Sequence, residues 1–161
     1  MWYKSIVGED YESKVRAMSV EKAMTVASYG ESVAAYRYRT LSEKTTSESH
    51  RAVFVEMAQE EQGHHLLVQN LLRELFPGTG FLLTAEDKEL VTVGSRMIEV
   101  TDSASFERAM TLLVESERQT GRFYAVLHEI TTHPRLKPLF KEMADECVEH
   151  AERLLQITPP A

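Results

Sequence analysis

The sequence predicts an all-α fold, a bundle of four long helices, and three observations support this prediction. Apolar residues recur at helical spacing through most of the chain. Proline and glycine, which interrupt helices, gather in a few short segments, most clearly in residues 76–81. The two halves of the chain also repeat each other. Because long helices with one apolar face cannot bury that face alone, we expect them to pack together.

We expect the four long helices at about residues 19–42, 49–75, 103–130 and 136–157. At ~1.5 Å per residue, each helix is roughly 30–40 Å long. The polar segment 42–49 forms the turn of the first hairpin, and the break at residues 131–134 forms the turn of the second. The connection over residues 76–102 is long and partly apolar. We therefore expect it to cross along the bundle, with one short helix near residues 85–91.

The two halves align at a constant offset of 86 residues, without a gap from position 23 to 64, and 15 of these positions are identical. Average composition predicts roughly two or three such identities. The matched polar residues on the inward faces include Glu31 and Glu117, Tyr38 and Tyr124, and His64 and His150. A general likeness of amphipathic helices does not explain these polar pairs. We therefore infer a duplicated helix hairpin, with halves of about 19–75 and 103–157, in a single domain over residues 1–161.

Length, charge and cysteine content exclude several classes of protein. The chain has 161 residues and a formal net charge of −7, so it has no excess of basic residues for binding nucleic acid. No apolar run reaches the ~18–20 residues that span a bilayer, and the first residues lack the apolar core of a signal peptide. The single cysteine, Cys147, excludes an internal disulfide and any four-thiolate metal site. We expect a cytoplasmic domain that binds neither nucleic acid nor membranes.

Five residues with metal-ligand chemistry fall on the apolar faces of the predicted helices. They are Glu31, Glu61, His64, Glu117 and His150. Any one of them alone fits the edge of the core, with its polar head in water. Several together, at a similar depth in four helices, are harder to explain in this way. An unpaired buried carboxylate is costly, so such groups pair, take up a proton or bind a metal.

The spacing of these residues favours a pair of metal ions. Glu61 and His64 form a Glu-x-x-His motif, whose two side chains reach the same side of a helix. Di-iron and di-manganese bundles combine one Glu from each of two helices with a Glu-x-x-His from each of the other two. Here Glu31, Glu117 and His150 supply all the remaining groups except one carboxylate.

Cys147 occupies the position of the missing carboxylate, three residues before His150. Three interpretations are open. The thiolate could bind zinc or iron, the residue could be a small apolar part of the core, or it could be a redox-active thiol beside a metal. Glu146 is the nearest substitute carboxylate, and we expect it to be exposed or to contact a ligand rather than the metal.

Tyr38 and Tyr124 each follow an inward-facing glutamate by two helical turns. One interpretation is a hydrogen bond from each hydroxyl to a ligand carboxylate, or a relay for single electrons. The other is an aromatic core residue whose hydroxyl is satisfied elsewhere. We expect both tyrosines to lie close to the metal positions.

Four segments resemble the helix motifs of the rubrerythrin-type, ferritin-like di-iron proteins: residues 30–38, 57–64, 117–124 and 140–150. The resemblance covers the four helices but neither the crossover nor the C-terminal tail. It implies a ferritin-like four-helix bundle that holds two iron ions, with zinc or manganese as alternatives. It also implies a homodimer. The ligands implied are Glu31, Glu61, His64, Glu117 and His150, with Cys147 or water completing the set.

The same resemblance implies an oxidoreductase that reduces peroxide or dioxygen. Members with peroxidase activity carry a further Glu three residues after the third-helix ligand, where this chain has Thr120. They often carry a four-cysteine rubredoxin-like domain, which this sequence lacks, so an external electron-transfer protein is required. The alternatives are a metal-binding, ferroxidase or iron-sequestering module without sustained turnover, and a zinc-holding or metal-free structural bundle.

Overall fold

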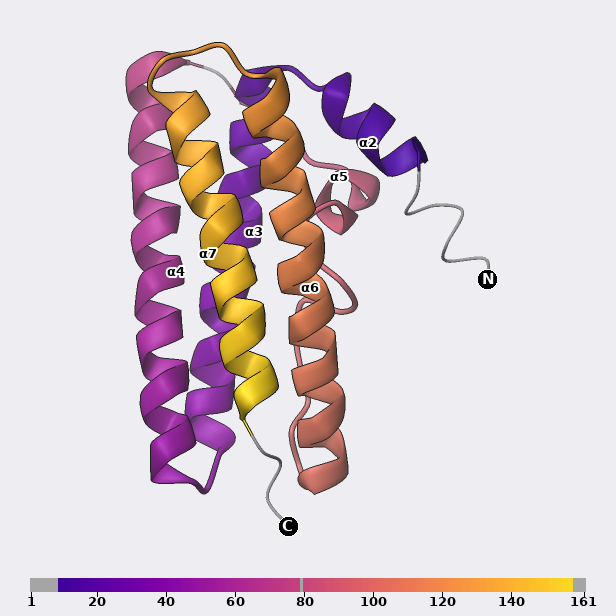
Figure 1. The fold of residues 1–161 in the computed structure, drawn as a ribbon, viewed down its shortest axis with the longest axis vertical. Helices are drawn as coiled ribbons and strands as arrows, with labels where there is room; N and C mark the ends of the chain where they lie inside the picture. Colours follow the sequence, from indigo (N-terminus) through magenta and orange to yellow (C-terminus); the bar gives the residue numbers. More distant parts are fainter. Residues whose placement is uncertain (1–8, 79, 158–161) are drawn as a thin grey trace.

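Two helix hairpins lie side by side and form the bundle in the computed structural model, which describes residues 9–78 and 80–157 (Figure 1). Its helices are α2 (Glu9–Arg16), α3 (Val20–Lys44), α4 (Glu48–Leu75), α5 (Ala85–Glu89), α6 (Ser103–Ile130) and α7 (Leu136–Gln156). Helices α3 and α4 form one hairpin, and α6 and α7 form the other. The described residues form helices and loops and no strands. The predicted all-α, ferritin-like bundle is confirmed.

Polar caps set the beginnings of three long helices. The side chains of Ser19, Ser47 and Asp102 each accept a hydrogen bond from the backbone N–H three residues later. This contact satisfies one of the free N–H groups at the start of a helix. The four long helices begin and end within two residues of their predicted bounds. Helix α7 starts without a side-chain cap, and Pro138 is accommodated in its first turn.

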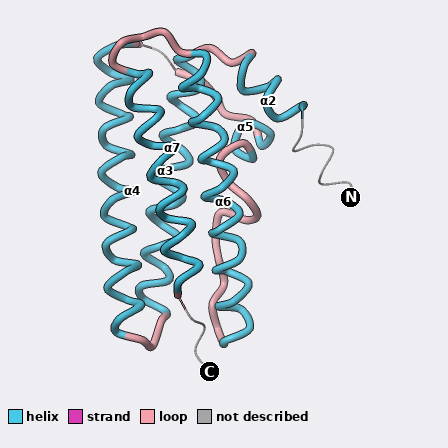
Figure 2. Tube along the Cα trace, viewed as in Figure 1, coloured by secondary structure: helices cyan, strands magenta, loops and turns pink. Residues whose placement is uncertain are grey.

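The crossover between the hairpins runs along the bundle beside α6 (Figure 2). It contains α5, where the sequence predicts a short helix near residues 85–91. Thr84 and Asp87 exchange side chain–backbone hydrogen bonds and cap its first turn. Three apolar residues that follow α5 are buried against the bundle, namely Leu90, Val91 and Val93. The crossover therefore closes one side of the core.

Helix α2 is a feature that the sequence analysis did not predict. It packs against α6, and its Tyr11 hydroxyl contacts two backbone carbonyls, those of Leu90 at 2.7 Å and Gln119 at 2.9 Å. Tyr11 and Val15 are buried. With only two buried apolar residues in eight, this helix depends on tertiary contacts for its stability.

The apolar core consists of two clusters at opposite ends of the bundle. One contains Phe123, Tyr124 and Phe140, and the other contains Phe54 and Phe106. Buried charged residues of the four long helices lie between the two clusters, where they can reach one another. None of the described helices is both long and apolar enough to cross a membrane. The extent of the domain and of its repeat halves stays a prediction.

Candidate metal centre

Each of the four long helices contributes to a polar centre in the middle of the bundle. Helices α3 and α6 supply Glu31 and Glu117, α4 supplies Glu61 and His64, and α7 supplies His150. Four of these residues are almost completely buried, with whole-residue exposed fractions between 2% for His150 and 6% for Glu117. His64 is more open, with 17% of its side chain exposed. The structure thus brings together all five residues on which the sequence analysis placed a metal.

These residues form two clusters that share one carboxylate. In the first, Nδ1 of His64 lies 3.6 Å from Glu31 and 3.8 Å from Glu61. In the second, Nδ1 of His150 lies 2.9 Å from Glu61 and 3.5 Å from Glu117. Within each cluster the potential ligand atoms all lie within 4.8 Å of one another. Glu61 belongs to both clusters, so its carboxylate could contribute to either of two metal positions.

Two tyrosines hold the carboxylates that are not shared. The Tyr38 hydroxyl of α3 donates a hydrogen bond to Glu117 of α6 at 2.6 Å, and the Tyr124 hydroxyl of α6 donates to Glu31 of α3 at 2.6 Å. The two bonds are related by the internal repeat. Each tyrosine therefore orients a carboxylate of the other hairpin.

Burial and mutual repulsion shift the acid–base properties of the centre. Burial, together with the charges of Glu31 and Glu117, raises the pKa of Glu61 well above its usual value. Burial lowers the pKa of His150, but the carboxylates of Glu117 and Glu61 outweigh burial and raise it to about 11. Burial raises the pKa of Glu31, but contact with His64 outweighs it and lowers this pKa. In the metal-free centre His150 therefore carries a proton near neutral pH, and Glu61 keeps its proton to a higher pH than an ordinary glutamate.

Two unsatisfied atoms indicate that the residues fit a metal pair. Oε2 of Glu31 and Nδ1 of His150 are buried without a hydrogen bond of good geometry, although Nδ1 of His150 lies 2.9 Å from Glu61. Such atoms are costly unless a further partner completes them. A divalent cation between the side chains supplies that partner for both atoms. Three carboxylates and two imidazoles suit iron, manganese or zinc by ligand type.

Cys147 lies outside both clusters. It is buried in the core. It packs closely against Gly121 of α6, because a Cβ at position 121 would lie only 3.3 Å from the Cβ of Cys147. Burial, together with the nearby carboxylates, raises the pKa of the thiol well above its ordinary value. These observations favour the interpretation of Cys147 as a small core residue, and its role as a ligand stays a prediction.

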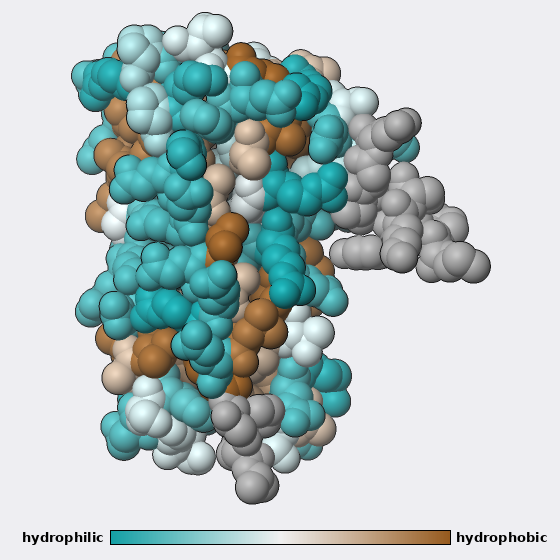
Figure 3. Space-filling view, in the orientation of Figure 1, coloured by the Kyte–Doolittle hydropathy of each residue, from teal (hydrophilic) through white to brown (hydrophobic). Residues whose placement is uncertain are grey.

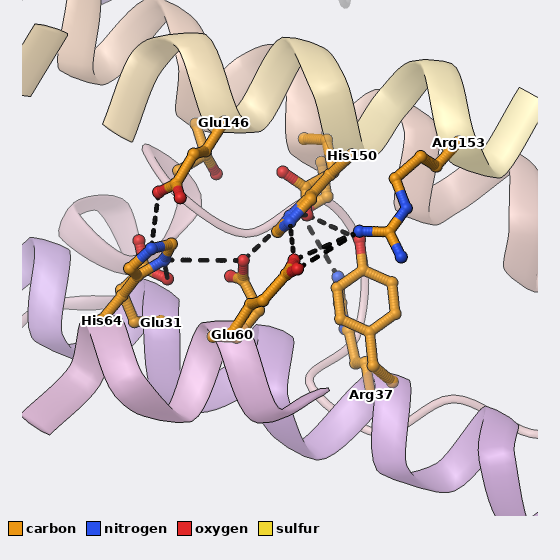
Figure 4. A network of polar contacts seen from close by, with 12 residues as sticks. Glu31, Arg37, Glu60, His64, Glu146, His150 and Arg153 are labelled. Carbon is orange, nitrogen blue, oxygen red and sulfur yellow. Dashed lines mark hydrogen bonds and ion pairs between the residues drawn. The ribbon is translucent and has the colours of Figure 1, made fainter. Parts of the chain in front are cut away.

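Two further carboxylates contact the histidines from outside the clusters. Glu146 of α7 lies 2.5 Å from Nε2 of His64, and Glu60 of α4 lies 2.7 Å from Nε2 of His150 (Figure 4). The sequence analysis treated Glu146 only as an exposed residue or one in contact with a ligand. It gave no role to Glu60. The signal was present in the repeat, because positions 60 and 146 carry the same residue 86 positions apart.

Arg37 is a buried neighbour of the centre that the sequence analysis missed. The residue is 1% exposed, and its guanidinium donates hydrogen bonds to the carbonyls of Val93 and Ser95 in the crossover. Arg37 and the carboxylates Glu31 and Glu117 line the same cavity of about 20 Å³. The sequence gave no sign of this role, because the carbonyl partners belong to the irregular crossover.

The comparisons with known proteins agree with this arrangement. The family model for rubrerythrin matches residues 22–158. A solved structure of a hypothetical protein from Pyrococcus furiosus is similar, with a TM-score of 0.74 and 23% identity. The match covers 88% of this chain and 90% of that one. At this identity the likeness concerns the fold. None of the curated proteins compared with the chain matches it significantly.

Proposed function

The chain belongs to the rubrerythrin family, and on this premise we propose that it is a di-iron oxidoreductase that reduces peroxide or dioxygen. The observation that carries the proposal is the pair of clusters joined by Glu61. Two metal ions held side by side supply two electrons to one small substrate, as the reduction of a peroxide to water requires. Manganese or zinc fits the same side chains, but zinc has no redox chemistry.

In this proposal the protein's own residues would hold the metal ions, orient the ligand carboxylates and limit the size of the substrate. Glu31, Glu61, Glu117, His64 and His150 would hold the metal pair. The hydrogen bonds from the two tyrosines keep the terminal carboxylates in place. The cavity beside them, of about 20 Å³, has room for roughly one water molecule, so a bulky organic substrate is excluded without movement of the bundle. The site therefore suits a small oxidant such as dioxygen or hydrogen peroxide.

An iron-oxidising or iron-sequestering module without sustained turnover is the second candidate. Thr120 stands where peroxidase members of the family carry a further glutamate, and its hydroxyl donates to the Val91 carbonyl at 3.1 Å. Cys147 stands where the second shared carboxylate is expected. Both differences reduce the negative charge around the metals, which favours this candidate over rapid redox cycling.

The proposed enzyme needs an external electron-transfer protein, because a chain with one cysteine cannot build a four-thiolate iron centre. We also propose a homodimer. Large apolar side chains are exposed on α4 and α7, namely Val55, Leu66, Leu67, Val148 and Leu155. Figure 3 shows apolar residues that interrupt the polar surface of this face. Sedimentation analysis of the parent and of Leu66→Asp tests the dimer, which the substitution should weaken.

The test of function combines iron content with peroxide turnover. Iron-loaded protein should consume hydrogen peroxide over many cycles when a separate reductant supplies electrons. His64→Ala should lose iron and turnover while its circular dichroism stays helical. His65→Ala is the matched control, because His65 contacts the Ser28 carbonyl at 2.9 Å and lies outside both clusters. Unchanged iron content in His64→Ala would contradict the site. Iron oxidation without sustained peroxide consumption would favour the second candidate.

A further inference from the structure

Both histidines of the centre present their ring nitrogens in the same way. Nδ1 of His64 and Nδ1 of His150 face the carboxylates of the two clusters. On the opposite edge of each ring, Nε2 lies close to one further carboxylate. Nε2 of His150 forms a hydrogen bond of 2.7 Å with Glu60. Nε2 of His64 lies 2.5 Å from Oε2 of Glu146 as an ion pair, without hydrogen-bond geometry. Figure 4 shows that both contacts span the interface between α4 and α7.

The two contacts are related by the internal repeat and cross between the hairpins. Glu60 and His64 lie on α4, while Glu146 and His150 lie on α7. Each glutamate lies four residues before the histidine of its own helix but contacts the histidine of the facing helix. Two chance surface pairs have no reason to obey the same offset of 86 residues. The repetition indicates a requirement shared by both metal positions.

Neither glutamate is placed as a member of the two clusters. Their side chains are about one-third exposed, at 34% for Glu60 and 32% for Glu146, whereas those of Glu31, Glu61 and Glu117 are between 4% and 7% exposed. The imidazole ring separates each outer glutamate from the cluster that its histidine joins. Arg153 also contacts Glu60, at 3.3 Å, and holds this carboxylate against the bundle.

A carboxylate on the outer nitrogen of a histidine has a defined physical effect. It accepts the N–H of that nitrogen and so leaves the lone pair of the other nitrogen free for a metal. It also fixes the ring plane and makes the metal-binding nitrogen more basic. Loss of such a partner typically weakens metal binding by about 10–100-fold.

We propose that Glu60 and Glu146 are positioning residues that hold His150 and His64 as Nδ1 metal ligands, each acting across the interface between the hairpins. The inference rests on the metal centre of the proposed function but needs no redox activity. It assigns a role to two carboxylates that are about one-third exposed, in addition to the five residues of the clusters. It also explains why α4 and α7, which have different surface residues, keep a glutamate at this depth.

The test uses zinc as a diamagnetic probe, with binding measured by chelator competition. Glu60→Ala should weaken zinc binding at the His150 position by about 10–100-fold, and Glu146→Ala should do the same at the His64 position. Glu60→Gln and Glu146→Gln keep a neutral acceptor and should lose less. Long-range ¹H–¹⁵N spectra of the zinc-loaded protein report which nitrogen of each histidine binds the metal.

The repeat also supplies matched controls. Glu56 and Glu142 lie one turn before Glu60 and Glu146, are exposed, and are themselves a repeated pair. Glu142→Ala removes the same charge without touching a histidine, so affinity should stay within about fivefold of the parent. Glu56→Ala is the stricter control, because Glu56 lies 3.1 Å from Arg153, which also contacts Glu60, so it tests whether loss of this neighbour alone weakens binding. A change to Nε2 coordination, or to a mixture, in the alanine variants at positions 60 and 146 would further support the inference.

The outcomes separate the inference from the proposed function. Zinc affinity and Nδ1 coordination that are unchanged in Glu60→Ala and Glu146→Ala would overturn the inference and leave the metal centre intact. Equal losses in the control variants would also overturn it, because charge alone would then explain the effect. Zinc binding as expected with no peroxide turnover would support the inference and contradict the proposed enzyme. A parent that binds no metal would overturn both.

Discussion

The two helix hairpins of this protein have the same architecture but contribute unequally to its centre. Hairpin α3–α4 supplies Glu31, Glu61 and His64, whereas hairpin α6–α7 supplies only Glu117 and His150. The repeat keeps the terminal carboxylate, the tyrosine and the histidine in both halves, and it fails where one half has Glu61 and the other has Cys147. A duplicated scaffold can therefore keep a symmetric frame while one half loses a ligand.

Removal of the shared carboxylate should have the largest effect. Glu61→Ala affects both clusters, so both metal ions should be lost, whereas Glu31→Ala should lose about one. The metal-free fold should persist, because burial of the Glu61 carboxylate is itself unfavourable. Metal content per chain and thermal unfolding, compared for the two variants, provide the measurement. Equal metal loss in both variants would show that Glu61 has no special position.

Restoring the repeat should strengthen metal binding. Cys147→Glu supplies a second shared carboxylate, and we expect about tenfold or greater tightening of metal affinity, measured by chelator competition. Cys147→Ser is the control, because it removes the thiol without adding a carboxylate. Weaker binding in Cys147→Ser than in the parent would indicate that the thiol of Cys147 is a ligand after all.

The acidity of the centre predicts that metal affinity rises with pH. The pKa of His150 is raised to about 11, so this group holds a proton in the metal-free protein at neutral pH, and the pKa of Glu61 is also raised above its usual value. A metal must displace the bound protons, and affinity should increase about tenfold per pH unit for each proton released. Metal titrations between about pH 6 and 8, the range in which ordinary histidines also titrate, provide the measurement. Affinity independent of pH would contradict these protonation states.

The tyrosines provide a finer test of the symmetry. Tyr38→Phe and Tyr124→Phe each remove a hydrogen bond of 2.6 Å to a carboxylate of the other hairpin. Each should lower the free energy of unfolding by about 1–3 kcal/mol, and by similar amounts. Tyr36→Phe, on the same helix as Tyr38 but outside the centre, should change it little. Chemical denaturation of the metal-free proteins is the measurement, and clearly unequal losses would show that the halves are not equivalent here.

The sequence predicts the bundle well because the signals for helix formation and the apolar faces that pack in the core fall in the same segments. Apolar spacing, the caps at Ser47 and Asp102 and the breaks at the hairpin turns all agree. The sequence analysis did not predict helix α2, because this short segment has few apolar residues. Its stability depends on the contacts of Tyr11 with the crossover and with α6.

The five cluster residues could be predicted because metal ligands on an apolar helix face are costly without a metal, and because the repeat marks them twice. The sequence could not predict which imidazole nitrogen faces inward, since that depends on the distance between α4 and α7. The sequence could not predict the burial of Arg37 either, because its hydrogen-bond partners are the backbone carbonyls of residues 93 and 95 in an irregular segment.

Iron content per chain is the most direct test of the central claim, that two clusters sharing Glu61 hold a metal pair. Protein grown with added iron is purified, and its iron and zinc contents are measured together with its near-ultraviolet absorption. About two irons per chain, with the absorption of an oxidised iron pair, is the expected result. One zinc ion per chain, or no metal, would contradict the claim and leave a duplicated bundle without the redox centre.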